Sequence, residues 1–163
     1  MQEETPAWLL ELFAAAPPPP ATRADALKAL ATTLNDFIGG PELCVIKEAM
    51  RGEEGQWFID KVMSLASLVE GMPKSYETNG QGDAAIVQLH YFKGSHDWYV
   101  TEKDSDPDGD GQLQAFGLVI NSYGPELGYI CLKELIACKV ELDLHWQPKT
   151  LAEVRKSRPE IWG

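Results

Sequence analysis

The spacing of apolar residues changes near Gly71, and this change constrains the fold more than any other feature of the sequence. Before Gly71, apolar residues recur at the three- and four-residue spacing of amphipathic helices, as in 56–71. After it, apolar and polar residues alternate in short runs that Gly, Pro and Asp separate, a pattern typical of antiparallel strands. The sequence therefore predicts an α+β fold, in which a helical N-terminal part precedes a curved antiparallel sheet of about five strands. We expect helices to cover one face of this sheet.

The chain has 163 residues, about the length of one domain. An apolar helical stripe followed by four prolines predicts an N-terminal helix and a proline spacer at 1–20. Residues 21–163 predict a single α+β domain, with a helical part at 21–72 and a sheet part at 73–163. Three alternatives remain for the N-terminal helix: it docks on its own domain, fits the groove of a partner, or forms a homodimer.

Local signals place the elements within this plan. Two pairs have the spacing of a capping box, which satisfies backbone groups at a helix start: Thr22 with Asp25, and Thr150 with Glu153. The first predicts a helix that continues to Ile38, and the second predicts the C-terminal helix; a short helix is expected at 132–137. Strands are expected at 85–92, 97–102, 115–121, 127–132 and 140–146. The last has the clearest alternation, with Val140, Leu142, Leu144 and Trp146 on one side and Glu141, Asp143 and His145 on the other.

The formal net charge of −11 restricts the class of partner. Nucleic-acid binding needs many Lys and Arg side chains that neutralise phosphates, and here the long-range field repels a polyanion. We therefore expect a protein partner with a basic surface and no direct contact with nucleic acid. No apolar run approaches the ~20 residues that span a bilayer, and the first residues are acidic, so we expect a cytoplasmic protein without membrane contact.

Motifs of enzymatic chemistry are missing from the sequence. GxSxG, GxGxxG and GxxxxGK[ST] do not occur, and the three cysteines lack CxxC spacing, so no cofactor is expected. His90, His96 and His145 lack metal-ligand spacing. Glu141, Asp143 and His145 would share a strand face that can hold an acid/base pair, although a half-exposed strand needs polar residues there in any case. A small metal-dependent hydrolase that uses the histidines with carboxylates on the sheet is the alternative function.

Acidic residues alternate along the segment 102–110: Glu102, Asp104, Asp106, Asp108 and Asp110. A calcium loop needs oxygen ligands at positions 1, 3 and 5, Gly at 6 and Glu at 12, but a loop that starts at Asp106 has Gly117 at position 12. The segment could instead imitate the charge of DNA. In an extended chain, alternate carboxylates lie about 6.6–6.8 Å apart, whereas one DNA strand has a charge every ~3.4 Å, so the segment has roughly half the charge density of that strand. We expect a solvated hairpin connection that supplies partner-binding carboxylates, with Trp98 as an apolar anchor beside it.

Short motifs occur in order between 68 and 154. They are Pro73 and Tyr76, Gly82-Asp83, LHYF at 89–92, WYxTE at 98–102, AFG at 115–117, ELGY at 126–129, Glu134-Leu135, LDLHW at 142–146, Pro148 and LAEV at 151–154. With these motifs the chain resembles a domain family of unknown function that is carried by conjugative plasmids, phages and integrative elements, often near antirestriction genes. The resemblance implies a small α+β domain with an accessory role in mobile elements, and it implies no catalytic residues. The helical first 70 residues and the acidic insertion at 104–110 depart from the shorter family pattern.

The sequence leads to the hypothesis of a non-enzymatic, acidic, protein-binding accessory protein of a mobile genetic element that inhibits a host defence nuclease of the restriction or CRISPR type. Nucleases have basic channels, so an acidic surface gains both association rate and complementarity. The expected partner-binding residues are Glu102, Asp104, Asp106, Asp108, Asp110 and Trp98. No catalytic residue and no metal ligand is assigned.

Overall fold

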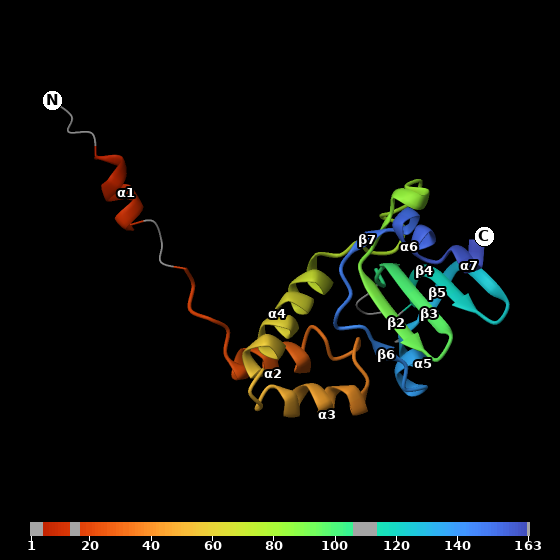
Figure 1. The fold of residues 1–163 in the computed structure, drawn as a ribbon, viewed down its shortest axis with the longest axis horizontal. Helices are drawn as coiled ribbons and strands as arrows, with labels where there is room; N and C mark the ends of the chain where they lie inside the picture. The colour runs from red at the N-terminus through yellow and green to blue at the C-terminus, as the bar shows by residue number, and fades with distance from the viewer. Residues whose placement is uncertain (1–4, 14–16, 106–113, 163) are drawn as a thin grey trace.

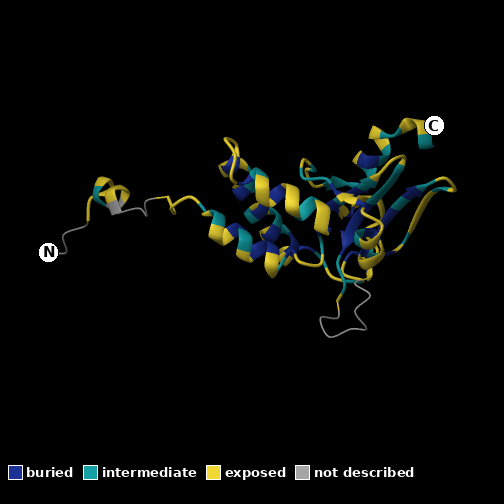
Figure 2. Cartoon of the chain, turned by 90° about the horizontal axis from the view of Figure 1, so that it is seen from below, coloured by how far each residue is buried: buried dark blue, intermediate teal, exposed yellow. Residues whose placement is uncertain are grey.

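The structure is a computed structural model, and it describes residues 5–13, 17–105 and 114–162. Helix α1 (Ala7–Phe13) lies apart from the rest of the chain in both views (Figures 1 and 2). Its side chains Trp8 and Leu12 are 61% and 70% exposed. None of the helices in the described part of the chain has the length and apolar character that a membrane crossing requires.

The helical part consists of α2 (Arg23–Ala31), α3 (Gly40–Ala49) and α4 (Gly55–Gly71). The capping box of Thr22 and Asp25 is present at the start of α2, and the backbone hydrogen bond at Thr22 lowers the pKa of Asp25. Helix α2 ends earlier than the predicted Ile38, because Thr32 turns its hydroxyl back onto the carbonyl of Lys28 at 2.8 Å and a run of turns follows. Ile38 is nevertheless buried.

The predicted α+β class is confirmed. Five antiparallel strands form an open sheet in the order β5-β4-β3-β2-β6, so the chain runs back and forth between neighbours from β2 to β5 (Figure 1). The strands are β2 (Leu89–Lys93), β3 (His96–Glu102), β4 (Gln114–Asn121), β5 (Gly124–Cys131) and β6 (Glu141–Leu142). A second, two-stranded sheet pairs β1 (Ile86–Val87) with β7 (Lys149–Thr150), and the 3-10 helix η1 (Gly82–Ala84) precedes β1.

The long strand expected at 140–146 is wrong in extent, since only Glu141–Leu142 pairs as β6. The side chain of Asp143 accepts the backbone N–H of His145 at 2.9 Å, and the carbonyl of Asp143 accepts that of Trp146 at 3.2 Å. Aspartate favours this local turn over a ladder, so the chain leaves the sheet at Asp143. The alternation of apolar and polar residues is typical of a strand, but the turn overrides it.

Strand β3 contains a bulge. Val100 pairs with Gly117 and Glu102 pairs with Phe116, so Thr101 is an extra residue in this strand. Gly117 is required at this point, because a Cβ there would lie 1.9 Å from the carbonyl oxygen of Tyr99. Side chains alternate between the two faces of a strand, and the extra residue places Glu102 on the face opposite to Val100.

Helices cover both faces of the sheet, which corrects the expectation of one covered face. The first face packs against the helical part and α5 (Leu132–Ala137) in the larger core cluster, which includes Leu30, Leu89 and Tyr91. The second face packs against α6 (Leu151–Ser157) in a smaller cluster that includes Tyr99, Leu118 and Val154. Helix α6 starts at the predicted capping box of Thr150 and Glu153, and α7 (Pro159–Trp162), which the sequence did not indicate, follows it. Buried residues, dark blue in Figure 2, gather where the helices meet the sheet.

Candidate functional site

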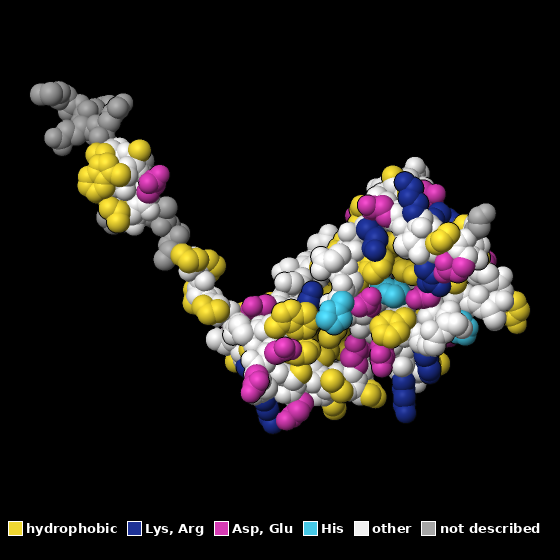
Figure 3. All heavy atoms as spheres, viewed as in Figure 1, with side chains coloured by type: hydrophobic (Ala, Val, Ile, Leu, Met, Phe, Trp, Pro, Cys, Tyr) yellow, Lys and Arg dark blue, Asp and Glu magenta, His cyan; other side chains and the backbone are white. Residues whose placement is uncertain are grey.

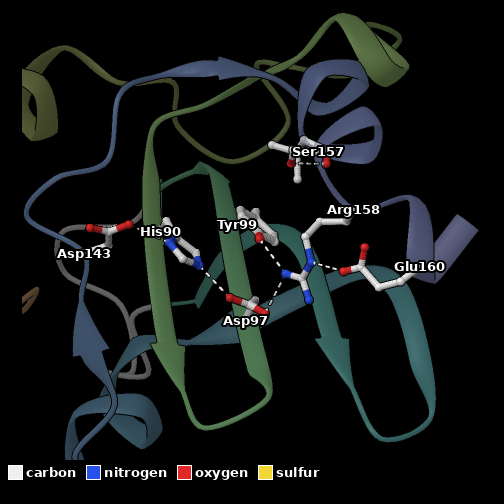
Figure 4. A network of polar contacts seen from close by, with 8 residues as sticks. His90, Asp97, Tyr99, Asp143, Ser157, Arg158 and Glu160 are labelled. Carbon is white, nitrogen blue, oxygen red and sulfur yellow. Dashed lines mark hydrogen bonds and ion pairs between the residues drawn. The ribbon is translucent and has the colours of Figure 1, made fainter.

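A network of charged side chains lies on the second face of the sheet, next to α6 and α7 (Figure 4). His90 of β2 is at its centre: Nδ1 lies 2.9 Å from Oδ2 of Asp143, and Nε2 lies 2.8 Å from Oδ1 of Asp97. The side chain of His90 is 12% exposed, and its ring stacks on that of Tyr99, its cross-strand partner, at 4.6 Å between centroids. We call the set His90, Asp97, Tyr99, Asp143, Arg158 and Glu160 the histidine network.

Arg158 joins this network to the C-terminal end of the chain. Its Nη1 donates to Oδ2 of Asp97 at 2.9 Å and to the hydroxyl of Tyr99 at 3.0 Å, and its Nε donates to Glu160 at 2.6 Å. The hydrogen bonds with Glu160 and Asp97 raise the pKa of Arg158 above its usual range, while burial raises the pKa of Tyr99. Arg158 therefore remains charged and attaches the segment before α7 to β3.

The histidine network is suited to holding the fold together, not to acid/base chemistry. Both ring nitrogens of His90 face carboxylate oxygens, so neither is available to a substrate proton. The other two histidines lie elsewhere: His96 pairs with Lys93 near the β2–β3 turn, and His145 packs on Trp57 at 5.4 Å. Histidine side chains, cyan in Figure 3, are seen beside acidic and basic ones on the face shown there.

The described residues contain no group of three or more His, Cys, Asp or Glu side chains placed to hold a metal ion. The predicted stripe of Glu141, Asp143 and His145 is not a single strand face, since Asp143 bonds to His90 while Glu141 and His145 are exposed. The metal-dependent alternative stays a prediction, and metal analysis of the purified protein would test it.

A cavity of about 350 Å³ lies at the other end of the second face, between the loop before η1 and strands β3, β4 and β5. We call it the tyrosine pocket. Its polar lining includes Thr78, Thr101 and Glu102, and its aromatic lining consists of Tyr76, Phe116 and Tyr129. The hydroxyls of Tyr76 and Tyr129 lie 3.0 Å apart, and the rings of Phe116 and Tyr129 meet edge to face at 5.6 Å. The hydrogen bond between these two hydroxyls raises the pKa of Tyr129.

Glu102 organises this pocket. The residue is 4% exposed, and its carboxylate accepts the backbone N–H groups of Tyr76 and Thr78, both at 2.9 Å, together with the hydroxyl of Thr78. Tyr76 has a φ of 70°, a left-handed conformation that is costly for a residue with a side chain. The hydrogen bonds that Glu102 accepts hold the loop in this conformation, which places the Tyr76 hydroxyl next to that of Tyr129.

The expected partner-binding residues do not form one surface in the described part of the chain. Glu102 is buried in the tyrosine pocket, while Trp98 is partly buried on the opposite face of β3, against the larger core cluster. Asp104 is half-buried, and its carboxylate accepts the backbone N–H of Gln114 at 3.2 Å. Asp106, Asp108 and Asp110 lie outside the described residues. Their role, like that of Asp104, stays a prediction.

The pocket itself was missed at the sequence level, although its residues carry signals. Its lining draws on Tyr76 and on the WYxTE, AFG, ELGY and LAEV motifs, which are far apart in the sequence and meet here. The bulge that turns Glu102 toward the loop, and the left-handed Tyr76, have no signature in residue spacing. Comparison of the chain with known protein families, curated proteins and solved structures gives no significant match.

Proposed function

We propose that this chain is a non-enzymatic, acidic, protein-binding accessory protein, and that the rim of the tyrosine pocket is its contact surface. The observation that carries the proposal is the exposure of three apolar side chains around one cavity: Tyr76 at 66%, Leu127 at 46% and Tyr129 at 57%. Exposed apolar groups that gather around a cavity mark interaction sites, and tyrosine is enriched among residues that dominate binding energy.

The charge of the chain supports a basic partner. A net charge of −11 steers a positively charged surface toward the protein and repels nucleic acid. Two exposed acidic residues, Glu77 and Glu126, adjoin the pocket residues Tyr76 and Leu127 in sequence. The carboxylates of 104–110 would add to this field, with Trp98 as a further contact on the other face.

The resemblance to a family of mobile elements supplies the biological setting of the proposal. An accessory protein of a plasmid or phage that binds a basic surface in the cytoplasm would act on a host defence nuclease, of the restriction or CRISPR type, by occupying its basic channel. Tight occupation of the channel excludes DNA without any reaction, and the occupied ring nitrogens of His90 favour such a binding role.

A protection assay tests this function. The chain is expressed in bacterial hosts that carry an active restriction or CRISPR nuclease, and the hosts are challenged with a sensitive phage or plasmid. We expect the efficiency of plating or transformation to rise at least about tenfold, as ~1.4 kcal/mol of competition at the nuclease would produce. No protection against either class of nuclease would contradict the anti-defence role.

Matched variants connect the assay to the surface. Tyr76→Ala combined with Tyr129→Ala removes the rim, and we expect protection to be lost. Tyr123→Ala is the control, because Tyr123 is 97% exposed in the turn between β4 and β5 and does not line the pocket. Replacing Asp104, Asp106, Asp108 and Asp110 with Asn should weaken the complex more at low salt than at high salt, since screening shortens the attraction. Equal protection by the rim variant would show that the contact surface lies elsewhere.

A further inference from the structure

We infer that the tyrosine pocket accepts the cationic end of a lysine or arginine side chain from the partner protein. This inference rests on the proposed function, and it names the group that the contact surface recognises. Three features of the pocket carry it: an anionic floor, an aromatic wall and a small volume.

The floor is a buried carboxylate that lacks a cationic partner. Glu102 is 4% exposed, and no described Lys, Arg or His side chain forms an ion pair with it. The adjacent Lys103 is directed elsewhere, because its Nζ donates to the carbonyls of Val69 and Glu70 at the end of α4. Buried charges are normally paired, so a cation that enters the pocket supplies a partner that the chain itself does not.

The carboxylate also retains capacity for a further donor. Its two oxygens can accept about four hydrogen bonds, and three donors are present: the N–H groups of Tyr76 and Thr78 and the Thr78 hydroxyl. These donors are neutral, so they leave the negative charge of Glu102 in place. An ammonium or guanidinium group is a stronger donor to a carboxylate than any of them.

The wall consists of three aromatic rings that favour a cation over other groups. Tyr76, Phe116 and Tyr129 line the cavity, and the bond between the two tyrosine hydroxyls joins two of the rings. An ammonium or guanidinium within about 6 Å of an aromatic face is attracted by the ring quadrupole. An anion would meet both the rings and Glu102 unfavourably, and a neutral apolar group would leave the carboxylate uncompensated.

The size of the cavity and the charge of the chain favour a side chain as the source of the cation. About 350 Å³ is near the lower limit of small-molecule pockets, which suits one long side chain whose stem packs against the aromatic lining. The long-range field that attracts a basic surface also orients its lysines and arginines toward the chain. A partner protein with an exposed basic residue is therefore the occupant.

Nuclear magnetic resonance of the isotope-labelled full chain tests this inference with capped amino acids. The probes are Nα-acetyl-lysine amide and Nα-acetyl-arginine amide, and Nα-acetyl-norleucine amide is the uncharged control with a similar stem. We expect either cationic probe to shift the amide signals of Tyr76, Thr78 and Tyr129 in a saturable manner, whereas the norleucine probe leaves them unchanged. Absence of saturable shifts with both cationic probes, or equal shifts with norleucine, overturns the inference.

Variants separate the pocket from a general attraction to the acidic chain. Tyr129→Ala should weaken binding of the lysine probe at least about fivefold, and Tyr123→Ala should leave it unchanged. Glu102→Gln should also weaken it, but this variant can loosen the loop, so the exposed Tyr129 provides the decisive comparison. Equal losses in the two tyrosine variants would overturn the inference.

The outcomes also distinguish this inference from the proposed function. If the chain protects against a nuclease and Tyr76→Ala combined with Tyr129→Ala protects equally well, the pocket inference fails while the anti-defence role stands. If the lysine probe binds the pocket but the chain protects against no nuclease, the recognition of a cation is supported and the proposed anti-defence role fails.

Discussion

The two faces of the sheet differ in what they bury. The first face packs against α2, α3 and α4 through the larger cluster of apolar residues, and α5 closes it. The second face has a smaller apolar cluster under α6, with the histidine network on one side and the tyrosine pocket on the other. Because both faces belong to the same strands, some residues of β3 and β4 pack in the larger apolar cluster, and others contribute to the smaller cluster, the histidine network or the tyrosine pocket.

This difference separates the region that we expect to stabilise the fold from the proposed recognition site. A large apolar cluster stabilises in proportion to the surface that it removes from water, and it offers nothing specific to a ligand. Paired charges contribute little net stability but fix the positions of side chains. The first face therefore supplies the stability that allows the second face to keep a buried carboxylate, a left-handed Tyr76 and an open cavity.

The largest expected effect tests the contrast between the two clusters. Leu30→Ala in α2, within the larger cluster, should lower the free energy of unfolding by about 4 kcal/mol, and Leu118→Ala in the smaller cluster by about 2–3 kcal/mol. The difference is expected because the smaller cluster has fewer buried residues and relaxes more easily around a truncated side chain. Each leucine is 1% exposed. Chemical denaturation measures both values, with Leu12→Ala as a control that should change stability by less than about 0.5 kcal/mol. A larger loss for Leu118 would reverse the assignment of stability to the first face.

The second prediction concerns the histidine network. His90→Ala leaves Asp143 without its side-chain partner and Asp97 with Arg158 alone, so we expect a loss of about 2 kcal/mol in the free energy of unfolding. His145→Ala is the control, since His145 is exposed, and it should cost less than about 1 kcal/mol. The losses in His90→Ala and Asp143→Ala should be less than additive when combined. Additive losses would mean that the two residues act independently.

The third prediction concerns pH and the edge of the first face. Burial raises the pKa of Glu42 from 4.5 to about 7, and its carboxylate accepts the backbone N–H of Leu142 at 3.0 Å. The folded chain therefore holds this proton more tightly than the unfolded chain, and the associated stability is present below pH 4.5 and is lost as the pH rises through 7. The shift corresponds to roughly 3 kcal/mol, which partial exposure to solvent reduces to about 1–2 kcal/mol.

Glu42→Gln measures this effect, because it removes the titration and retains an acceptor for Leu142. Between pH 4.5 and pH 7, we expect the free energy of unfolding of the wild-type chain to fall by about 1–2 kcal/mol relative to that of the variant. Chemical denaturation across this pH range measures the difference. Glu48→Gln on the same helix is the control, since its side chain is 79% exposed. A constant difference between wild type and Glu42→Gln over this range would contradict the prediction.

The smallest expected effect belongs to helix α1, which lies apart from the sheet and the helices that cover it (Figure 1). Deleting residues 1–20 should change the free energy of unfolding by less than about 0.5 kcal/mol, because Trp8 and Leu12 of α1 are exposed. Light scattering of the two chains then tests the homodimer alternative. If the full chain is a dimer and the shortened chain is a monomer, α1 forms the dimer contact. If both chains have the same number of protomers, the homodimer through α1 is ruled out.

The sequence was sufficient for what depends on periodicity and local capping. The helices α2, α4, α5 and α6, the two capping boxes and the antiparallel sheet follow from short-range patterns and are confirmed. The extent of the strand after Val140 was wrong, because the alternation of apolar residues did not reveal the turn that Asp143 forms with its own side chain. Local hydrogen bonds of this kind compete with the ladder and leave the apolar pattern intact.

The candidate site was less accessible from the sequence, because it depends on contacts between distant residues. The run of carboxylates suggested that Glu102 and Asp104 belong to one acidic surface. In the structure, Glu102 is buried in the tyrosine pocket, whereas Asp104 bonds to Gln114 at the start of β4. Likewise, Asp97, Asp143 and Arg158 meet at His90 from three segments that no spacing rule connects. Net charge leads to the expectation of a basic partner, but it does not indicate which surface would meet that partner.

The bulge in β3 determines which face of the sheet Glu102 occupies. If the strand paired regularly from Val100 to Glu102, with Thr101 opposite Phe116, the carboxylate would lie on the face of Val100, toward the larger core cluster, and the loop at Tyr76 would lose its acceptor. The bulge therefore belongs to the pocket as much as the side chains that line it. Homologous chains that use the proposed recognition surface should therefore keep this bulge, together with a glycine opposite Val100, even where little else in their sequences agrees.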